Sequence, residues 1–393
     1  MEQVQKKNIL GTEPIGGLLR QFAVPSIIAM LVGALYNIVD QFFIGRSVGE
    51  LGNAATNVAF PLTISCVALA LLFGIGGAAS FNLTLGGGDR EKALFYIGNA
   101  ATLLFGSGVI LGTVALFCLT PMLRFFGSPD NVLAYAKTYT GITALGFPFL
   151  ILTNGGGHLV RADGSPLNAM LYNLSGALIN TVLDPLFIFG LDMGVVGAAV
   201  ATVVGQVASL VMAMLFHYRW DREIRQDWKR IRPRWGLIRG IYAIGIPAAV
   251  MQGLLSVMVL FVNLVFGTQG DLAEPLQAAY GIYYKIQQFA LFAAFGLSNT
   301  LITVVAFHYG RREKARLRQC VRYGLLYAAG LMLIVTVLFQ LFAAPISGLF
   351  QSDGSREVQQ LCMRSMRICT LGYVFMGITV LIQGILQGFR CVF

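Results

Sequence analysis

The sequence predicts an all-α polytopic membrane protein built from two related bundles of helices. Of the 393 residues, 56% are hydrophobic and 12% are charged, and the mean hydropathy is +0.72. Soluble proteins carry about 25% charged residues, so a soluble globular fold is disfavoured. The apolar residues gather in ten long stretches, and an internal repeat relates the two halves of the chain.

Each of the ten stretches is long enough for a helix to cross a bilayer, which needs about 20 mostly apolar residues. None of them alternates apolar and polar residues as a strand of a membrane barrel would. The predicted spans are residues 22–43, 55–79, 95–117, 139–159, 169–189, 195–217, 241–266, 279–303, 323–346 and 369–388.

Lysine and arginine in the connecting loops predict the orientation, because cytoplasmic loops are enriched in both. With the N-terminus inside, the inner segments carry 21 of these residues and the outer segments carry 6, while Lys285 lies within a span. The net charge of +10 therefore reflects the lysines and arginines of the cytoplasmic segments, and we expect no nucleic-acid partner. The start of the chain lacks the apolar core of a signal peptide, and the six cysteines show no disulfide or zinc spacing.

The two halves of the chain resemble each other at a constant offset of 222 residues. The Arg-Glu-Lys-Ala sequence at 90–93 recurs at 312–315, and Pro25 recurs as Pro247. Because the first half holds an even number of spans, we expect two parallel lobes related by a pseudo-two-fold axis along the membrane normal. The predicted domains are an N-lobe at 1–218, a cytoplasmic basic linker at 219–240 and a C-lobe at 241–393.

The second half shows only four spans where the first half shows six. Adding the offset to the fifth and sixth spans places their counterparts near 391–439, beyond Phe393. We therefore expect the second lobe to lack its last two helices.

Two carboxylates lie inside apolar stretches, Asp40 in the first predicted span and Asp184 in the fifth. A charge in hydrocarbon is costly, so an ionisable residue there indicates a functional site. At about 1.5 Å per residue they lie roughly 27 Å and roughly 22 Å from the inner ends of their spans, in the outer half of the membrane. Tyr36 shares a helix face with Asp40, as Asn180 does with Asp184, and Thr202 of the sixth span lies at the same depth.

Such a cluster suits two tasks, and the residues leave the choice open. Two carboxylates that share a site cannot both ionise cheaply, so the pair could take up a proton. The oxygens of Asp40, Asn180, Asp184 and Thr202 could instead hold Na⁺. A structural role as hydrogen-bonding clamps between helices is the alternative.

Other polar residues inside the spans are candidates for a substrate-binding cleft, and two prolines are candidate hinges because proline removes a helical hydrogen bond. A lysine near the outer end of a span could alternatively extend to the membrane surface. The cleft candidates are Asn37, Asn154, Lys285, Tyr284 and Gln288, and the hinge candidates are Pro25 and Pro247.

Sequence signatures of enzymes are missing. The glycine runs at 86–88 and 155–157 lack the Lys-Ser/Thr pair of a phosphate-binding loop, and neither HExxH nor G-x-S-x-G occurs. We therefore expect no cofactor, and any transport would be driven by an ion gradient.

Several of these segments together resemble the multidrug and toxic compound extrusion (MATE) family, and the similarity covers the whole chain. They are Ala23–Pro25 followed by Tyr36–Asp40, then Asn180–Gly190, then Gly194–Thr202. The resemblance implies twelve spans in two six-helix lobes around a V-shaped cleft. It also implies export of cationic, lipophilic drugs in exchange for protons or sodium.

Carried over to matching positions, Asp40 resembles the family's first-lobe cation-binding carboxylate. Asp184, Asn180 and Thr202 resemble its partners, and Tyr36 and Asn154 are looser matches. The spans at 241–266 and 369–388 contain no Asp or Glu, which departs from the subgroup whose second lobe binds the coupling ion.

We expect a monomeric antiporter of organic cations in the bacterial inner membrane, with a cytoplasmic N-terminus. One alternative is a lipid-linked oligosaccharide or lipid flippase of the same superfamily, which would need several cationic residues in the cleft where only Lys285 is found. A membrane-embedded enzyme and a channel are more distant alternatives.

Overall fold

The computed structural model describes residues 9–48, 50–220, 231–268, 273–349 and 356–389, and these ranges are helical without strands. The long helices are α2 (Ile15–Val48), α3 (Glu50–Gly86), α4 (Arg90–Phe117), α6 (Asp130–Ala162), α7 (Pro166–Pro185), α8 (Gly194–Trp220), α9 (Trp235–Gly267), α10 (Ala273–Gly310), α11 (Lys314–Leu341) and α14 (Tyr373–Gly388). Shorter elements join them: α1 (Ile9–Thr12), α5 (Leu119–Phe125), the π-helical turn η1 (Leu186–Gly190), α12 (Ala343–Leu349), α13 (Arg356–Cys369) and the 3₁₀ turn η4 (Thr370–Gly372).

Eight helical segments within the described ranges are long and apolar enough to cross a bilayer. They correspond to all the predicted spans except 139–159 and 169–189. These two lie in α6 and in α7 with η1, whose apolar runs are interrupted by polar side chains such as Asn154 and Asn180. The chain is thus a multi-pass membrane protein with at least eight helices suited to spanning.

Two prolines break helices at corresponding places. A proline ring clashes with the carbonyl group four residues earlier, which belongs to Phe117 for Pro121 and to Leu341 for Pro345. Helix α4 ends at Phe117 and α11 ends at Leu341, each followed by a short helix. The predicted span 323–346 was therefore wrong at its end, because Pro345 stops the helix earlier.

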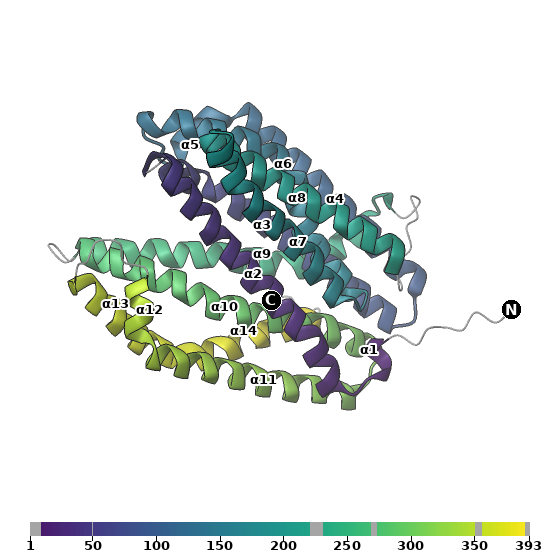
Figure 1. Ribbon diagram of the computed structural model, residues 1–393. Coiled ribbons are helices and arrows are strands. Elements are labelled where there is room, and N and C mark those ends of the chain that lie inside the picture. Colours follow the sequence, from purple (N-terminus) through teal and green to yellow (C-terminus); the bar gives the residue numbers. More distant parts are fainter. Residues whose placement is uncertain (1–8, 49, 221–230, 269–272, 350–355, 390–393) are drawn as a thin grey trace.

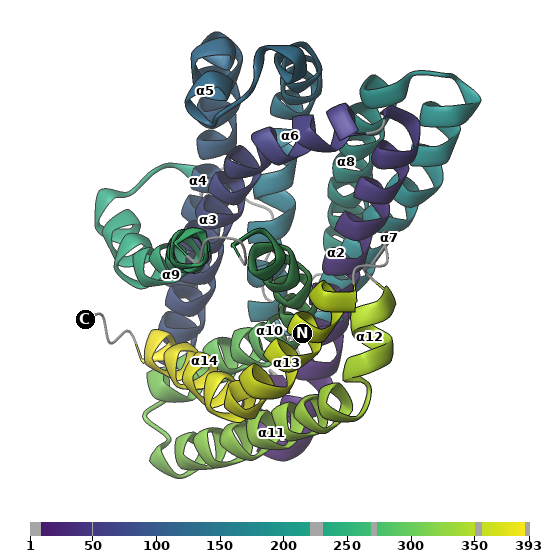
Figure 2. The same ribbon diagram turned by 90° about the vertical axis from the view of Figure 1, so that its left-hand side faces the viewer.

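Packing divides most of the helices into two groups (Figure 1). The first group is α3, α4, α6, α7 and α8, and the second group is α10, α11, α13 and α14. Helix α2 packs on both α10 and α7, and α9 packs mainly on α3. Figure 2 shows α2 running from beside the second group to beside α7 and α8.

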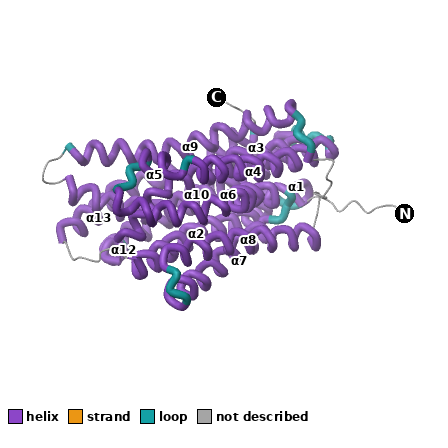
Figure 3. Tube along the Cα trace, turned by 90° about the horizontal axis from the view of Figure 1, so that it is seen from above, coloured by secondary structure: helices purple, strands orange, loops and turns teal. Residues whose placement is uncertain are grey.

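The long axes of most helices follow a common direction, with α1 at one end and α13 at the other (Figure 3). We call these the α1 end and the α5 end, since α5 also lies at the latter. In Figure 1 the two groups lie close together at the α1 end and diverge toward the α5 end.

Backbones of the two groups touch at the α1 end. A Cβ atom on Gly86 of α3 would lie 2.2 Å from the carbonyl oxygen of Phe307, and one on Gly310 of α10 would lie 2.1 Å from that of Leu83. Real Cβ atoms essentially never approach another atom closer than 3.0 Å. Only glycine therefore permits this contact between α3 and α10.

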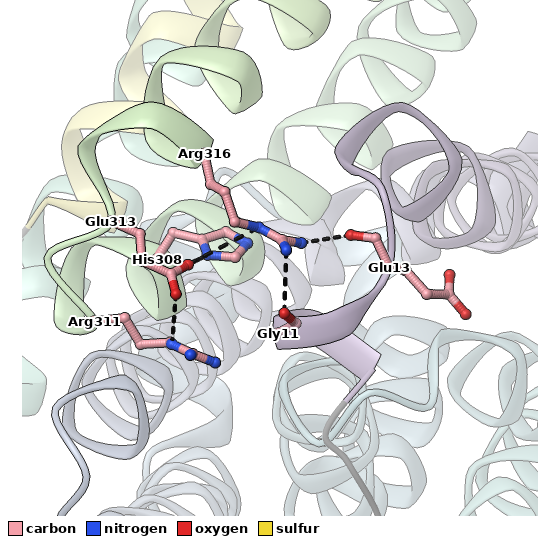
Figure 4. Close-up of polar contacts among 6 residues, drawn as sticks. All are labelled: Gly11, Glu13, His308, Arg311, Glu313 and Arg316. Carbon is pink, nitrogen blue, oxygen red and sulfur yellow. Dashed lines mark hydrogen bonds and ion pairs between the residues drawn. The ribbon is translucent and has the colours of Figure 1, made fainter.

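Helix α1 is tied to the second group by Arg316 (Figure 4). The Arg316 guanidinium donates hydrogen bonds to the carbonyl oxygen of Gly11, at 3.1 Å, and to that of Glu13. Glu313 lies between Arg316 and the buried His308, and its carboxylate is 2.9 Å from His308 Nδ1. The α1 end is thus held by both glycine packing and a charged network.

The predicted linker 219–240 lies partly outside the described residues, at 221–230. The part just before α9 is fastened to α4 by Asn99, whose amide accepts a 2.7 Å hydrogen bond from the backbone N–H of Arg234. The same side chain donates to the carbonyl of Arg232, and Thr102 donates to that of Ile231 at 3.0 Å.

Candidate functional site

A buried acidic pair lies where α2, α7 and α8 pack together. Asp40 of α2 is 8% exposed and Asp184 of α7 is fully buried. Their carboxyl groups lie within hydrogen-bonding reach of each other. The sequence placed both residues in the outer half of separate spans, and the structure brings them into one site.

Asn180 and Thr202 complete the polar surroundings of Asp184. The Asn180 side-chain nitrogen donates to Asp184 Oδ1 at 3.3 Å and to Thr202 Oγ1 at 3.5 Å. Both residues are buried, and Asn180 lies one helical turn before Asp184 on α7. The amide therefore bridges α7 to α8 at the level of the carboxyl pair.

Two tyrosines border the acidic pair. Tyr36 lies close to Asp40 and Asp184 from the preceding turn of α2. Tyr139 of α6 lies close to Asp40, Tyr36 and Asp184, and its hydroxyl hydrogen-bonds with Thr202. Sequence reasoning missed Tyr139, although it begins the predicted fourth span and so had the right depth.

The local backbone at Asp184 is irregular because of Pro185. Proline has no N–H, so the carbonyl of Thr181 loses its helical donor, and the chain continues as the π-helical turn η1. Such turns are frequent at functional sites. The N–H groups of Leu191 and Met193 donate to the carbonyls of Leu186 and Phe187, both at 3.0 Å, which closes the turn.

Three buried oxygen atoms of this site accept no hydrogen bond. Asp40 Oδ1, Asp184 Oδ2 and Asn180 Oδ1 are buried and have no hydrogen-bond partner. Within the described ranges, neither carboxyl group pairs with a lysine or arginine. Buried carboxylates need a proton or a cation to balance their charge, so this oxygen set fits a bound H⁺ or Na⁺.

Two candidates for the cleft lie together in the second group. Tyr284 and Gln288 are half-buried on α10, and their side chains hydrogen-bond. The ring of Tyr280 lies 6.1 Å from that of Tyr284 and 6.0 Å from that of Tyr283. An aromatic cluster of this kind is able to bind an organic cation through its ring faces.

The remaining candidates are not part of either cluster. Asn154 is exposed on α6, 15 residues past Tyr139 toward the α1 end. The side chains of Asn37 and Lys285 lie outside the described part of the structure. Pro25 and Pro247 are half-buried inside α2 and α9, away from the acidic pair.

Comparisons with known proteins agree on one family. The MatE family model matches residues 25–186 and 247–390. The multidrug export protein MepA of Staphylococcus saprophyticus is 26% identical over 368 residues, covering 91% of this chain and 80% of that protein. MepA of Staphylococcus haemolyticus is 27% identical over 364 residues, with the same coverage.

Solved structures show the same fold. An outward-facing multidrug resistance MATE family transporter of the MOP superfamily matches with a TM-score of 0.92 at 24% identity, covering 99% of this chain and 86% of that one. A MATE structure in complex with MaL6 matches with a TM-score of 0.92 at 25% identity.

Proposed function

The chain belongs to the MatE family of multidrug efflux transporters, and on this basis we propose that it is a secondary antiporter that exports organic cations in exchange for H⁺ or Na⁺. The family is one of membrane transporters and not of enzymes. The observation that carries the proposal is the buried pair of Asp40 and Asp184, in which one oxygen of each carboxyl group has no hydrogen-bond partner.

The acidic pair is the proposed coupling site. A proton or sodium ion that binds there lowers the negative charge of the buried pair by one unit and lets α2, α7 and α8 pack as the structure shows them. Release of that ion leaves charge in a dry site, which favours another arrangement of these helices. A ligand can shift such an equilibrium only by its difference in affinity for the two states, and the buried carboxylates supply that difference.

The proposed architecture is two parallel lobes related by a pseudo-two-fold axis, with ten spans in this chain. Reciprocal packing supports it, since α2 of the first half packs on α10 and α9 of the second half packs on α3. The paired breaks at Pro121 and Pro345 also support it. The α1 end then faces the cytoplasm, in line with the distribution of lysine and arginine.

The substrate is proposed to bind between the groups, with the half-buried Tyr280 and Tyr284 offering ring faces to a lipophilic cation. Pro25 and Pro247 are the proposed hinges, because each lies in a helix that packs on the opposite group. We propose that the protein acts as a monomer in a bacterial cell membrane and needs no cofactor. A flippase function is not favoured by any of the comparisons.

Export of a fluorescent cationic dye from cells or proteoliposomes tests the proposal. Asp40→Asn keeps the shape of the side chain and removes its charge, so gradient-dependent export should fall to background. Asp130→Asn is the matched control, because that carboxylate is also near the α5 end but is 91% exposed. Undiminished export by Asp40→Asn under an imposed H⁺ or Na⁺ gradient would refute the coupling role.

A further inference from the structure

An open cavity lies at the α5 end of the first group. Its volume is about 570 Å³, and it is lined by Tyr135 and Thr138 of α6 and by Asp192, Met193 and Val195 where α8 begins. Under the proposed orientation this end faces the outside. Asp192 is the only charged residue among those that line the cavity, and it is exposed.

The cavity owes its shape to the irregular segment that follows Asp184. After η1 the chain turns sharply, with positive φ angles of 51° at Asp192 and 53° at Gly194. Non-glycine residues rarely adopt this conformation, and at Asp192 it places the residue on the cavity wall. The same stretch of chain thus carries one carboxylate of the buried pair and, eight residues later, an exposed carboxylate.

Two helix faces lead from the cavity to the buried pair. On α8, Val195, Ala198 and Thr202 lie on one face, and seven residues of helix span about 10 Å. On α6, Tyr135 of the cavity wall lies one turn above Tyr139, whose hydroxyl bonds with Thr202. The separation between the cavity and the acidic pair is therefore about two helical turns.

A small apolar cluster lies beside the acidic pair. Ile44, Ile188 and Ala198 form it, and Phe43 and Tyr139 pack against it. Tyr139 is half-buried, and it is the one side chain of this cluster that ends in a polar group facing the acidic pair.

We propose that this cavity is the outer entry port for the coupling cation, separate from the path that the exported substrate takes between the two groups of helices. Asp192 raises the local concentration of cations at the mouth, and Tyr139 covers the inner end of the port. The port rests on the proposed antiport function. It lets the driving ion reach Asp40 and Asp184 while substrate still occupies the protein.

Filling the cavity tests the port directly. Ala134 lines the cavity and is exposed on α6, so Ala134→Trp occupies the space without entering the core. The control is Asn131→Trp, an exposed position on the same helix that does not line the cavity. In proteoliposomes, Ala134→Trp should raise the external Na⁺ or H⁺ concentration for half-maximal dye exchange at least about fivefold, with Asn131→Trp unchanged.

Removing the charge at the mouth gives a second, electrostatic readout. A unit charge about 10 Å from the path changes local cation concentration by about two- to fourfold, so Asp192→Asn should raise the half-maximal concentration by that factor. The effect should be present at roughly 0.01 M ionic strength and vanish at roughly 1 M, because salt screens exposed charges. Glu91→Gln is the control, because that exposed carboxylate is at the start of α4, at the α1 end.

Three results would overturn the port: no change in Ala134→Trp, equal changes in Ala134→Trp and Asn131→Trp, or an Asp192→Asn effect that does not depend on salt. Asp40→Asn, measured in parallel, separates this failure from failure of the antiport itself. If Asp40→Asn loses coupled exchange while Ala134→Trp keeps a normal ion dependence, only the port is wrong. If Asp40→Asn keeps coupled exchange, the proposed function and the port both fall.

Discussion

The glycine contact at the α1 end should control which side of the protein is open. Gly86→Ala and Gly310→Ala each add one Cβ atom where α3 and α10 touch. The added atom would lie 2.2 Å from Phe307 O or 2.1 Å from Leu83 O, against a practical limit of 3.0 Å. The two backbones must therefore separate by 0.8 Å or 0.9 Å at this point, the differences between these distances.

The cost of such overpacking is typically about 1–3 kcal/mol. The cost applies only while the α1 end is closed, because the clash disappears when α3 and α10 move apart. A destabilisation of this size shifts the closed-to-open ratio about 5–150-fold toward opening. Each variant should therefore populate a state in which the α1 ends of the two groups are separated.

Gly106→Ala and Gly330→Ala are the matched controls. Both glycines lie inside long helices, α4 and α11, and a Cβ atom added at either meets nothing within 4 Å. Each control makes the same Gly→Ala change without the clash, and because its position is inside a helix it gains roughly 1 kcal/mol of helix propensity. Any difference between the two pairs then reports the contact between α3 and α10.

Pulsed electron paramagnetic resonance between spin labels at positions 92 and 314 measures the opening. Lys92 and Lys314 are exposed at the starts of α4 and α11, next to the contact. The labels need a background without the exposed Cys118 and Cys369. We expect a longer-distance population in Gly86→Ala and Gly310→Ala only. Identical distance distributions in all four variants would refute the idea that this contact closes the α1 end.

Two further variants test how the α1 end and the linker are held. Arg316→Ala removes the hydrogen bonds that the charged guanidinium donates to the carbonyls of Gly11 and Glu13, each worth about 1.5–3 kcal/mol. Amide hydrogen exchange at residues 9–12 should therefore accelerate. Arg322→Ala changes an exposed arginine on the same helix and should leave this exchange unchanged. Asn99→Ala leaves the backbone N–H of Arg234 without its 2.7 Å acceptor, which should lower the free energy of unfolding by about 1–3 kcal/mol; an unaltered thermal midpoint in detergent would contradict this.

Much of the fold follows from the sequence because the bilayer imposes strong rules. Long apolar runs had to be helices, and eight of the ten predicted spans correspond to observed helical segments suited to spanning, with 323–346 wrong at its end. That error was avoidable, since Pro345 stands four residues after Leu341 and proline excludes the continuous helix. The contact at Gly86 and Gly310 was not predictable, because a glycine beside a loop is equally compatible with a role in the turn and with a close contact between helices.

The candidate site likewise contains residues that were predictable from the sequence and one that was not. A lone carboxylate in an apolar run is a strong signal, and depth along the helix was enough to group Asp40, Asp184, Asn180 and Thr202. Tyr139 was missed because a tyrosine at the end of a span is commonly an interfacial residue. Which face of α6 packs on α8 decides its role, and that depends on tertiary packing.

Helix α2 offers a physical link between the acidic pair and the contact of the two groups. Near its α5 end it carries Asp40, which faces Asp184 of the first group. Nearer the α1 end it packs on the second group, where a Cβ atom on Gly296 of α10 would lie 2.7 Å from the Ile27 Cα. One helix is thus held by a titratable site at one end and by close packing on the opposite group at the other.

Ion binding at Asp40 and packing on α10 therefore both stabilise the observed position of α2, and release of the ion opposes that packing. Thr300 of α10 donates a buried 3.5 Å hydrogen bond to Ser26 of α2. The half of α2 nearer the α1 end therefore cannot slide along α10 without losing this bond. Movement caused by charging Asp40 is therefore resisted where α2 packs on α10, which favours bending of α2. Pro25 lies beside Ser26, where a helix lacks one of its hydrogen bonds, and bending there needs the least energy.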